Sequence, residues 1–455
     1  MITSSAFAGK RYAVLGLARS GAAAAEALIA SGAEVIAWDR QDVAREPFVG
    51  RCRLIDPLEL DLTGFAGVVV SPGVPLNTHP IAPHVWQYGL PVIGDLELFA
   101  QARAALPAHK VVGITGTNGK STTTALVHHI LHTAGVPCVM GGNIGDPIMA
   151  QEPLPEGGVY VLELSSFQID LTFTLDCDIA ALTNITPDHL DRYAGFEAYA
   201  ASKERLFQMQ ARGTALICDE DAPSAAIAAR LAAEGKPLVR VKTADLDAQE
   251  LAEGRSPSLA GPHNAQNAAV AVAICRQLGL SDDTIAHGLA TYPGLPHRME
   301  RVCEAEGVIY INDSKATNAA SAAPALAAFP PDPAIRGGQP RIHWIVGGLP
   351  KEDGLGACAD HLGNVAAAYT VGEAGPMFAD LLEGRVQVER CELISEAVRR
   401  AEEAAQPGDV VLLSPACASY DQFRDYEKRG YHFRQMVGVI TGCDTGDVAN
   451  RSILP

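Results

Sequence analysis

Short runs of β-branched and aliphatic residues alternate with longer alanine-rich stretches from one end of this chain to the other. The short runs have the length and composition of buried strands, and alanine favours helix in the longer stretches. Strands and helices that alternate in this way build parallel sheets with crossover helices, so we predict an α/β fold. The predicted strands are Arg11–Leu15, Glu34–Trp38, Gly67–Val70, Val111–Ile114, Val159–Leu162, Ile179–Leu182, Ile342–Val346 and Val410–Leu413.

The predicted strands fall into three groups along the chain. One boundary is expected near residue 95, and the Pro- and Gly-punctuated segment 292–298 reads as a second linker. We therefore predict three domains, over residues 1–95, 96–297 and 298–455. Ligands of open α/β sheets bind beyond the carboxyl ends of the strands, so the loops after the strands are where sites are expected.

Composition excludes several classes of protein. The chain has 455 residues, enough for about three domains of typical size. Its formal charge of −18 repels polyanions, so no nucleic-acid partner is expected. No apolar run reaches the roughly 18 residues of a membrane span, and Met1–Lys10 lacks a signal peptide, so we expect a cytoplasmic protein without membrane insertion. The ten cysteines are at least 26 residues apart, which favours buried reduced thiols over a zinc or redox pair.

A glycine-rich segment between a predicted strand and a predicted helix carries the clearest chemistry. In residues 111–124, Gly116 and Gly119 allow the backbone amides to surround phosphate oxygens. Lys120 supplies a positive charge, and Ser121 opens the helix with a hydroxyl that can bind magnesium. Ile114 stands where the usual phosphate-loop template has its first glycine, so this loop is a variant. The segment predicts nucleotide binding.

A second glycine-rich loop follows the first predicted strand. Residues 16–21 match the dinucleotide-binding pattern G-x-G-x-x-G except that Ala18 replaces the middle glycine. Asp39 ends the second strand about where an acidic residue would contact a ribose. A nicotinamide-dependent oxidoreductase is therefore one alternative, although it leaves the central phosphate loop unexplained. A nucleotide-binding regulatory module is another.

The central loop resembles a known family. Residues 116–122, Gly-Thr-Asn-Gly-Lys-Ser-Thr, are similar to the ATP loop of the Mur ligases and folylpolyglutamate synthetases. Residues 312–318 and 413–423 look like the D-glutamate-adding branch of the Mur ligases. The resemblance implies a Rossmann-like N-terminal domain, a central P-loop ATPase-type parallel sheet and a C-terminal Rossmann-like domain. Another Mur-type or folylpolyglutamate-type amide ligase is the alternative.

The same resemblance implies an activity. It is the ATP-dependent joining of UDP-N-acetylmuramoyl-L-alanine to D-glutamate through an acyl phosphate, in cytoplasmic peptidoglycan precursor synthesis. ATP is the implied cofactor, together with two magnesium ions, and a monomer is expected. Either His189 or a modified lysine could be the base that deprotonates the incoming amine, and the sequence does not choose between them.

The resemblance also implies site residues, which come from all three predicted domains. For ATP these are Gly116, Thr117, Asn118, Gly119, Lys120, Ser121, Thr122, Asn267, Arg298, Asp313 and Lys315. For the UDP substrate they are Ala18, Arg19, Ser20, Asp39, Arg40, Ser71 and Asn143. For D-glutamate they are Thr317, Lys351, Ser419, Tyr420 and Tyr426. For metal they are Ser121, Glu163, His189 and Lys203, and the implied catalytic residues are Lys120, His189 and Lys203.

Three of these assignments have ordinary structural alternatives. Lys203 lies in a predicted helix, where a lysine is normally a solvated surface charge. The resemblance instead implies that carbon dioxide carbamylates Lys203, which requires an uncharged amine. Asn267 at a helix start is more often a cap than an adenine ligand. Leu349, in the loop that carries Lys351, stands where relatives are expected to have an acidic residue.

Overall fold

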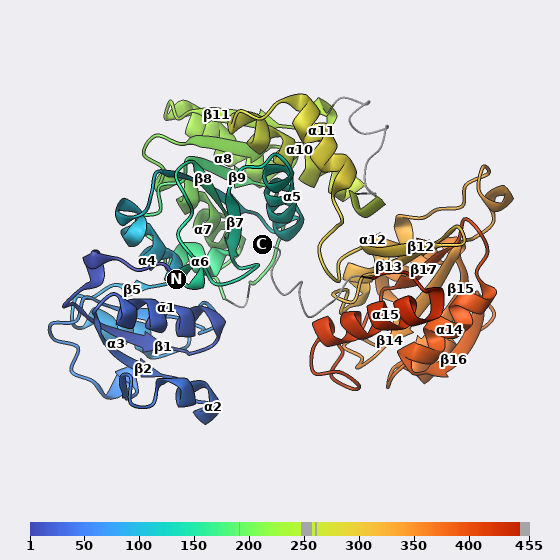
Figure 1. The fold of residues 1–455 in the computed structure, drawn as a ribbon, viewed down its shortest axis with the longest axis horizontal. Coiled ribbons are helices and arrows are strands. Elements are labelled where there is room, and N and C mark those ends of the chain that lie inside the picture. The colour runs from blue at the N-terminus through green and yellow to red at the C-terminus, as the bar shows by residue number, and fades with distance from the viewer. Residues whose placement is uncertain (191, 247–256, 260–261, 446–455) are drawn as a thin grey trace. The chain divides into compact units, whose positions relative to one another are not determined.

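The computed structural model describes residues 1–190, 192–246, 257–259 and 262–445 (Figure 1). Its strands form three sheets, of five, six and six strands. All strand pairs are parallel except one in the third sheet. The predicted α/β fold is therefore confirmed.

The first sheet has the strand order β3-β2-β1-β4-β5. Its strands are β1 (Arg11–Leu15), β2 (Glu34–Trp38), β3 (Arg53–Leu54), β4 (Gly67–Val70) and β5 (Val92–Ile93). The helices are α1 (Arg19–Ala30), α2 (Asp42–Arg45), α3 (Ile81–Trp86) and α4 (Asp95–Ala102), with short 3₁₀ turns η1 (Ser5–Phe7), η2 (Glu46–Phe48), η3 (Pro57–Glu59) and η4 (Arg103–Ala105).

The second sheet has the order β11-β10-β9-β6-β8-β7. Its strands are β6 (His109–Thr115), β7 (Cys138–Gly142), β8 (Gly158–Glu163), β9 (Ile179–Leu182), β10 (Thr214–Cys218) and β11 (Leu238–Val241). The helices are α5 (Lys120–Thr133), α6 (Ser166–Asp170), α7 (Phe196–Gln208), α8 (Ala222–Ala233), α10 (Pro262–Gln277) and α11 (Asp282–Thr291), with η5 (Ile148–Ala150), η6 (Thr243–Asp245) and η7 (Pro257–Leu259).

The third sheet has the order β12-β13-β17-β14-β15-β16. Its strands are β12 (Glu300–Ala305), β13 (Val308–Asn312), β14 (Ile342–Gly347), β15 (Val365–Val371), β16 (Gln387–Glu392) and β17 (Val410–Leu413). The helices are α12 (Ala319–Ala327), α13 (Gly375–Leu382), α14 (Ile394–Ala404) and α15 (Tyr426–Thr441), with η8 (Arg336–Gly338) and η9 (Gly356–Asn364). The edge strand β12 pairs antiparallel with β13.

Buried side chains of the third sheet show why it carries helices on both faces. Trp344 and Val346 of β14 belong to the hydrophobic cluster that includes α12 and α13. Ile345, between them, belongs to the cluster that includes α14 and α15. Successive side chains of a strand point to opposite faces, so this strand is buried on both sides, as parallel sheets require.

The predicted strands are confirmed, five of them with the same bounds and the others with ends extended by one or two residues. Helix α5 begins at Lys120, so Ser121 lies in its first turn rather than at its first residue. The described residues form two compact units, of which the first holds the first two sheets with α10 and α11 and the second holds the third sheet. The division into domains at 95/96 and 297/298 remains a prediction.

Candidate functional site

The central phosphate loop joins β6, in the middle of the second sheet, to α5. The neighbouring strands β8 and β9 are parallel to β6, so their carboxyl ends lie at the same edge of the sheet. The Lys120 Nζ donates hydrogen bonds to two carbonyls of the loop, those of Gly116 at 3.0 Å and Thr117 at 2.8 Å. The lysine side chain is thus held against the loop that precedes it.

Two glycines of this loop have conformations that other residues rarely adopt. Gly116 has φ +148° and Gly119 has φ +82°. A Cβ at Gly116 would lie 1.9 Å from the Thr183 Oγ1, and one at Gly119 would lie 1.9 Å from the Asn267 Oδ1. Both positions therefore require glycine for backbone angle and for space. The contact also shows that Asn267 of α10 packs against the loop.

The end of β9 holds the loop in place. Thr117 N donates to the carbonyl of Asn184 at 2.8 Å, and Asn118 N donates to the Asn184 Oδ1 at 2.9 Å. The Thr183 Oγ1 donates to the carbonyl of Asn118 at 2.7 Å. Sequence reasoning missed Thr183 and Asn184 as site residues. Their position directly after a strand that neighbours β6 was the signal that could have found them.

Glu163 lies at the end of β8 and is almost fully buried. Its Oε1 accepts a hydrogen bond from the Asn143 Nδ2 at 2.8 Å. Its Oε2 is buried without any hydrogen-bond partner. An unpartnered buried carboxylate oxygen is costly unless a cation pairs with it, so this donor fits a magnesium ion. Within the described residues, His, Cys, Asp and Glu side chains form no group of three or more that could bind a metal ion.

Lys203 is buried, which overturns its interpretation as a solvated lysine on a helix surface. Only 1% of the residue is exposed on α7. Its Nζ donates to the Gly116 carbonyl at 2.7 Å and lies 4.6 Å from the centre of the Tyr199 ring. Burial, and then the charge of Lys120, lower the pKa of Lys203 to about 7. The amine is therefore partly uncharged near neutral pH, as carbamylation requires.

His189 lies in the loop after β9 and is exposed. Its backbone has φ +52°, and its ring centre lies 4.9 Å from that of Phe167 and 6.3 Å from that of Tyr199. The carboxylate of Asp188 lies 3.5 Å from its Nε2. Asp188 also acts electrostatically on Lys203, so His189, Asp188 and Lys203 surround one region beside the phosphate loop. Sequence reasoning did not single out Asp188.

The predicted UDP-substrate residues follow β1, β2 and β4 of the first sheet and β7 of the second. Asp39 accepts hydrogen bonds from two backbone amides, those of Leu17 at 2.7 Å and Gln41 at 2.9 Å. The Ser71 Oγ donates to the Gly16 carbonyl at 2.9 Å. Arg19 donates to the Gly145 carbonyl at 2.8 Å. Asp39 and Ser71 thus shape the loop at residues 16–20, whereas Ala18, Arg19 and Arg40 are exposed and Ser20 is half-buried.

Asn267 and Asn264 are both buried near the start of α10. The Asn267 Nδ2 donates to the Asn264 Oδ1 at 3.2 Å. Asn267 also contacts Gly119, so its side chain packs against the phosphate loop and does not act only as a helix cap. Ser121 and Thr122 are half-buried in the first turn of α5.

In the third sheet, Asp313 and Lys315 follow β13. Asp313 is buried, and burial raises its pKa to about 7. It accepts hydrogen bonds from the Ser414 Oγ at 2.8 Å and from Met299 N at 3.2 Å. The Lys315 Nζ lies 3.2 Å from the Tyr426 hydroxyl and 4.9 Å from the centre of its ring. Tyr426 is thereby brought to Lys315.

The remaining predicted site residues of the second unit differ in burial, and only some of them contact one another. The Lys351 Nζ lies 3.4 Å from the Thr317 Oγ1, so these two side chains meet. Ser419 is buried, whereas Tyr420 is 70% exposed and points away from the packed interior. Arg298 is exposed. In the Lys351 loop, Leu349 pairs with Ala418 through two backbone hydrogen bonds, of 2.9 and 3.0 Å.

Arg429 on α15 is a buried cation that sequence reasoning missed. It donates to Ser314 Oγ and O, at 3.0 and 2.8 Å, and to the carbonyls of Ala418 and Cys417, at 3.1 and 3.0 Å. It therefore joins the loop after β13 to the loop after β17. These loops carry Lys315, Thr317 and Ser419. No local pattern marks Arg429, because its partners lie in two loops that are 11 or more residues away in sequence.

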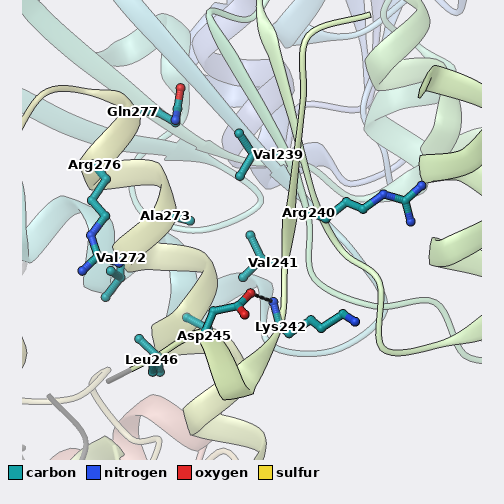
Figure 2. Close-up of a pocket in the computed structure, with 11 residues that line it drawn as sticks. Val239, Arg240, Val241, Lys242, Asp245, Leu246, Val272, Ala273, Arg276 and Gln277 are labelled. Carbon is teal, nitrogen blue, oxygen red and sulfur yellow. Dashed lines mark hydrogen bonds between the residues drawn. The ribbon is translucent and has the colours of Figure 1, made fainter. Parts of the chain in front are cut away.

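A pocket lies between β11 and α10 (Figure 2). Val241, Leu246 and Val272 contribute apolar lining, and the Asp245 carboxylate accepts a hydrogen bond from Lys242 N at 2.8 Å. Of the rim arginines, Arg240 pairs with Asp219 at 2.8 Å and Arg276 pairs with Asp282 at 2.7 Å. None of the predicted site residues lines this pocket.

Two family models match this chain. The model of the Mur ligase middle domain matches residues 114–275, and that of the Mur ligase, glutamate ligase domain matches residues 297–417. These ranges contain the phosphate loop, Glu163, Lys203 and most of the residues predicted for the third sheet.

Similar proteins cover nearly the whole chain. A UDP-N-acetylmuramoylalanine–D-glutamate ligase from Novosphingobium aromaticivorans is 61% identical over 442 residues, 97% of each chain. The corresponding ligase of Zymomonas mobilis is 54% identical over 455 residues, covering 97% of this chain and 100% of the relative.

Solved structures support the fold. A UDP-N-acetylmuramate-alanine ligase from Thermotoga maritima matches with a TM-score of 0.55 at 17% identity, covering 94% of this chain and 99% of that one. A UDP-N-acetylmuramoylalanyl-D-glutamyl-2,6-diaminopimelate–D-alanyl-D-alanyl ligase from Acinetobacter baumannii also has a TM-score of 0.55, at 18% identity, covering 96% and 92%. The chain therefore belongs to the Mur ligase family, in its branch of UDP-N-acetylmuramoylalanine–D-glutamate ligases.

Proposed function

We propose how this chain, an ATP-dependent ligase that joins D-glutamate to UDP-N-acetylmuramoyl-L-alanine in peptidoglycan synthesis, forms its amide bond. The L-alanyl carboxylate is first converted to an acyl phosphate, and the amine of D-glutamate then displaces the phosphate. The observation that carries this mechanism is the meeting of Lys120 and the buried Lys203 at the carbonyl of Gly116.

In the first step, the substrate carboxylate attacks the γ-phosphorus of ATP and ADP leaves. The Lys120 ammonium and the backbone amides at the start of α5 are proposed to bind the phosphates, because a helix N-terminus offers amide donors to anions. Asn267 lies against Gly119 and is proposed to contact the adenine. Asp313, Lys315 and Arg298 are proposed to complete the ATP site, at the ribose and phosphates.

We propose that two magnesium ions bind beside the phosphate loop, supported by the unpartnered Glu163 oxygen. The Ser121 hydroxyl and the Glu163 carboxylate would hold one, and His189 with a carbamylated Lys203 would hold the other. When bound, magnesium would neutralise the negative charge of the phosphoryl oxygens. The Lys203 carbamate forms when the uncharged Nζ bonds to the carbon of carbon dioxide and releases a proton to water. The lowered pKa of Lys203 supports this, since an ammonium has no free electron pair to attack.

In the second step, the amine of D-glutamate attacks the acyl carbonyl. D-Glutamate carries two carboxylates, so its pocket needs cationic and hydroxyl donors. Lys351, Thr317, Ser419 and Tyr426 are proposed to supply them, with a backbone or ring contact from Tyr420. The amine must lose a proton before it attacks, and either His189 or the modified lysine could accept it.

The UDP end of the substrate is proposed to bind the first sheet. The loop at Ala18, Arg19 and Ser20 would face the pyrophosphate, with Asp39 and Arg40 beside the uracil. Ser71 and Asn143 would contact the substrate between this loop and the catalytic centre. Asn143 is hydrogen-bonded to Glu163, so it joins the substrate loop to the proposed metal ligand.

Two assays test this mechanism. ADP release with UDP-N-acetylmuramoyl-L-alanine and a panel of amino acids should require D-glutamate, and release without any amino acid would favour a regulatory nucleotide-binding module. Oxygen-18 placed in the substrate carboxylate should appear in the released phosphate. Its absence from phosphate would rule out the acyl phosphate.

The cellular setting follows from the co-substrate. We propose a cytoplasmic reaction, because ATP is available there. None of the described helices is long and apolar enough to cross a bilayer. We also propose that the enzyme acts as a monomer, since one chain supplies all of the proposed site residues; sedimentation at working concentration tests this.

A further inference from the structure

Two half-buried cysteines lie together at the edge of the third sheet. Cys303 is on the edge strand β12, and Cys443 follows the end of α15. The other cysteines are buried, except Cys52 in the first unit. We propose that Cys303 and Cys443 are a modification site, at which a peroxide or a small disulfide oxidises the two thiols to a reversible disulfide.

The contacts around the pair hold both cysteines beside Thr441 and the edge strand β12. The Cys303 Sγ lies 3.8 Å from the Thr441 Oγ1, and that same oxygen accepts a hydrogen bond from Cys443 N at 3.2 Å. The Cys443 Sγ lies 3.9 Å from the carbonyl of Glu304, the residue after Cys303. The Cys443 sulfur also acts electrostatically on the Cys303 thiol, as expected of neighbouring side chains.

The chain holds Cys443 in this position from both sides. Gly442, directly before it, has φ +70° and turns the chain at the end of α15. After it, the carbonyl of Thr445 accepts a hydrogen bond from Arg434, and Arg434 also forms a buried ion pair with Glu300 at the start of β12. The segment after α15 is thus already bound to β12 by non-covalent contacts, which keep Cys443 near Cys303.

The local environment assigns the order of the two thiols. Burial, and then the neighbouring Cys443 sulfur, raise the pKa of Cys303 to about 12. The Cys443 Sγ contact with the Glu304 carbonyl is exposed, whereas the Cys303 Sγ contact with Thr441 is half-buried, so an oxidant reaches the Cys443 sulfur first. The thiolate is the nucleophile in thiol oxidation.

With hydrogen peroxide, the Cys443 thiolate attacks one oxygen and the O–O bond breaks. Hydroxide leaves, takes up a proton and becomes water, and Cys443 becomes a sulfenic acid. The Cys303 sulfur then attacks the Cys443 sulfur and loses its proton. The S–O bond breaks, and a second water leaves. Two thiols have lost two electrons to one peroxide, and a dithiol reductant reverses the change.

The test uses the full chain. The protein is exposed to hydrogen peroxide or oxidised glutathione and then denatured in the presence of N-ethylmaleimide, which alkylates the remaining free thiols. It is digested without reductant. We expect one cross-linked peptide pair that contains Cys303 and Cys443, two hydrogens lighter than the separate peptides, and its loss on treatment with dithiothreitol. Separate alkylated peptides for both cysteines, or direct conversion of Cys443 to a sulfinic acid, would overturn the proposal.

Variants distinguish a disulfide between Cys303 and Cys443 from unspecific oxidation of the chain's cysteines. In Cys303→Ser, Cys443 should react with a sulfenic-acid probe or with glutathione, and no cross-link should form. Cys52 is also half-buried, and it should remain alkylated in the same digest. Basal ligase activity of Cys303→Ser and Cys443→Ser should match that of the unmodified protein, because neither residue belongs to the proposed site.

A second measurement does not depend on digestion. The cross-link would span the chain from β12 to the end of α15, so it constrains most of the third sheet in the unfolded state. The oxidised protein should unfold on the order of 5–10 °C above the reduced protein. The Cys443→Ser variant should show no such difference, and an equal shift in that variant would contradict the pairing.

Discussion

Burial changes the chemistry available to the side chain of Lys203. With a pKa of about 7, its amine is mostly uncharged above neutral pH and mostly charged below it. Carbamylation should therefore fail as the pH falls below about 7. In buffer depleted of carbon dioxide, we expect added bicarbonate to restore activity at pH values above the pKa and to have little effect well below it.

The carbamate carbon of protein prepared in ¹³C-labelled bicarbonate should give an NMR signal with the same pH dependence. Lys203→Ala should lose this signal, and short carboxylates should partly restore its activity. Lys10→Ala, a change at an exposed lysine, serves as the control and should behave like the parent protein. Full activity of Lys203→Ala without added carboxylate would end the carbamate proposal.

Glu163 and Glu97 are both buried carboxylates, but their surroundings differ. One oxygen of Glu163 has no partner, whereas Glu97 accepts hydrogen bonds from the backbone amides of Phe173 and Thr174, at 2.7 and 2.9 Å. Glu163→Gln should lower kcat by about 100-fold and raise the magnesium concentration needed for half-maximal rate, because it removes a charge from the proposed metal site.

Glu97→Gln should change the stability of the protein and not its response to magnesium. It replaces an acceptor of backbone hydrogen bonds, so it should lower the melting temperature and leave the magnesium dependence unchanged. Titration of the initial rate with magnesium, together with thermal unfolding, checks both variants. Equal magnesium dependence in Glu163→Gln and the parent would remove Glu163 from the metal site.

At the scale of elements, the conformation of the phosphate loop depends on the backbone angles of its glycines and on the space beside them. Gly119 and Gly157 have nearly the same backbone angle, φ +82° and φ +83°. A Cβ at Gly119 would collide with Asn267, whereas one at Gly157 meets nothing within 4 Å. Gly119→Ala should therefore abolish measurable ATP binding by calorimetry, while Gly157→Ala should cost only about 1 kcal/mol of stability from backbone strain and leave ATP affinity intact. An equal loss of ATP affinity in both variants would show that strain, and not the contact, is responsible.

Arg429 joins two loops of the third sheet. Arg429→Met should destabilise this sheet by about 3 kcal/mol, because four hydrogen bonds from a buried guanidinium are lost together. It should also raise the KM for D-glutamate more than it lowers kcat. Arg399→Met removes exposed ion pairs on α14 and is the matched control. It should leave the stability of the sheet and the KM for D-glutamate unchanged.

Tryptophan fluorescence during urea unfolding can isolate this effect. Trp344 is buried in the third sheet, and the chain's other tryptophans are Trp38 and Trp86. With those two replaced by Phe, the signal reports the third sheet alone. An unchanged unfolding midpoint in Arg429→Met would contradict a structural role for the guanidinium.

Strands and the phosphate loop could be predicted from sequence because their signals are local. Runs of apolar residues mark buried strands such as Ile179–Leu182, and the spacing of Gly116, Gly119 and Lys120 marks a loop between a strand and a helix. The burial of Lys203 could not be predicted, since α7 positions it against a loop 87 residues earlier in the chain. Arg429 was missed for the same reason: its partners lie in other loops of the chain, at Ser314, Cys417 and Ala418.

At the scale of the whole molecule, the predicted site residues are shared between two compact units. The chain enters the third sheet through His297 and Met299, which have φ +62° and +47°, uncommon values for residues other than glycine. An acyl phosphate must be protected from water until the amine arrives. We expect a non-hydrolysable ATP analogue with both substrates to reduce the radius of gyration in X-ray scattering. Identical profiles with and without ligands would argue against such closure.

The Gly116 carbonyl accepts hydrogen bonds from two lysines, and this sharing has a consequence for the order of events. The positive charge of Lys120 helps to keep Lys203 uncharged. A nucleotide phosphate that pairs with Lys120 cancels that influence and makes Lys203 easier to protonate. Under the proposed carbamylation, Lys203 would therefore react with carbon dioxide most readily before ATP binds, and ATP that binds first would delay turnover.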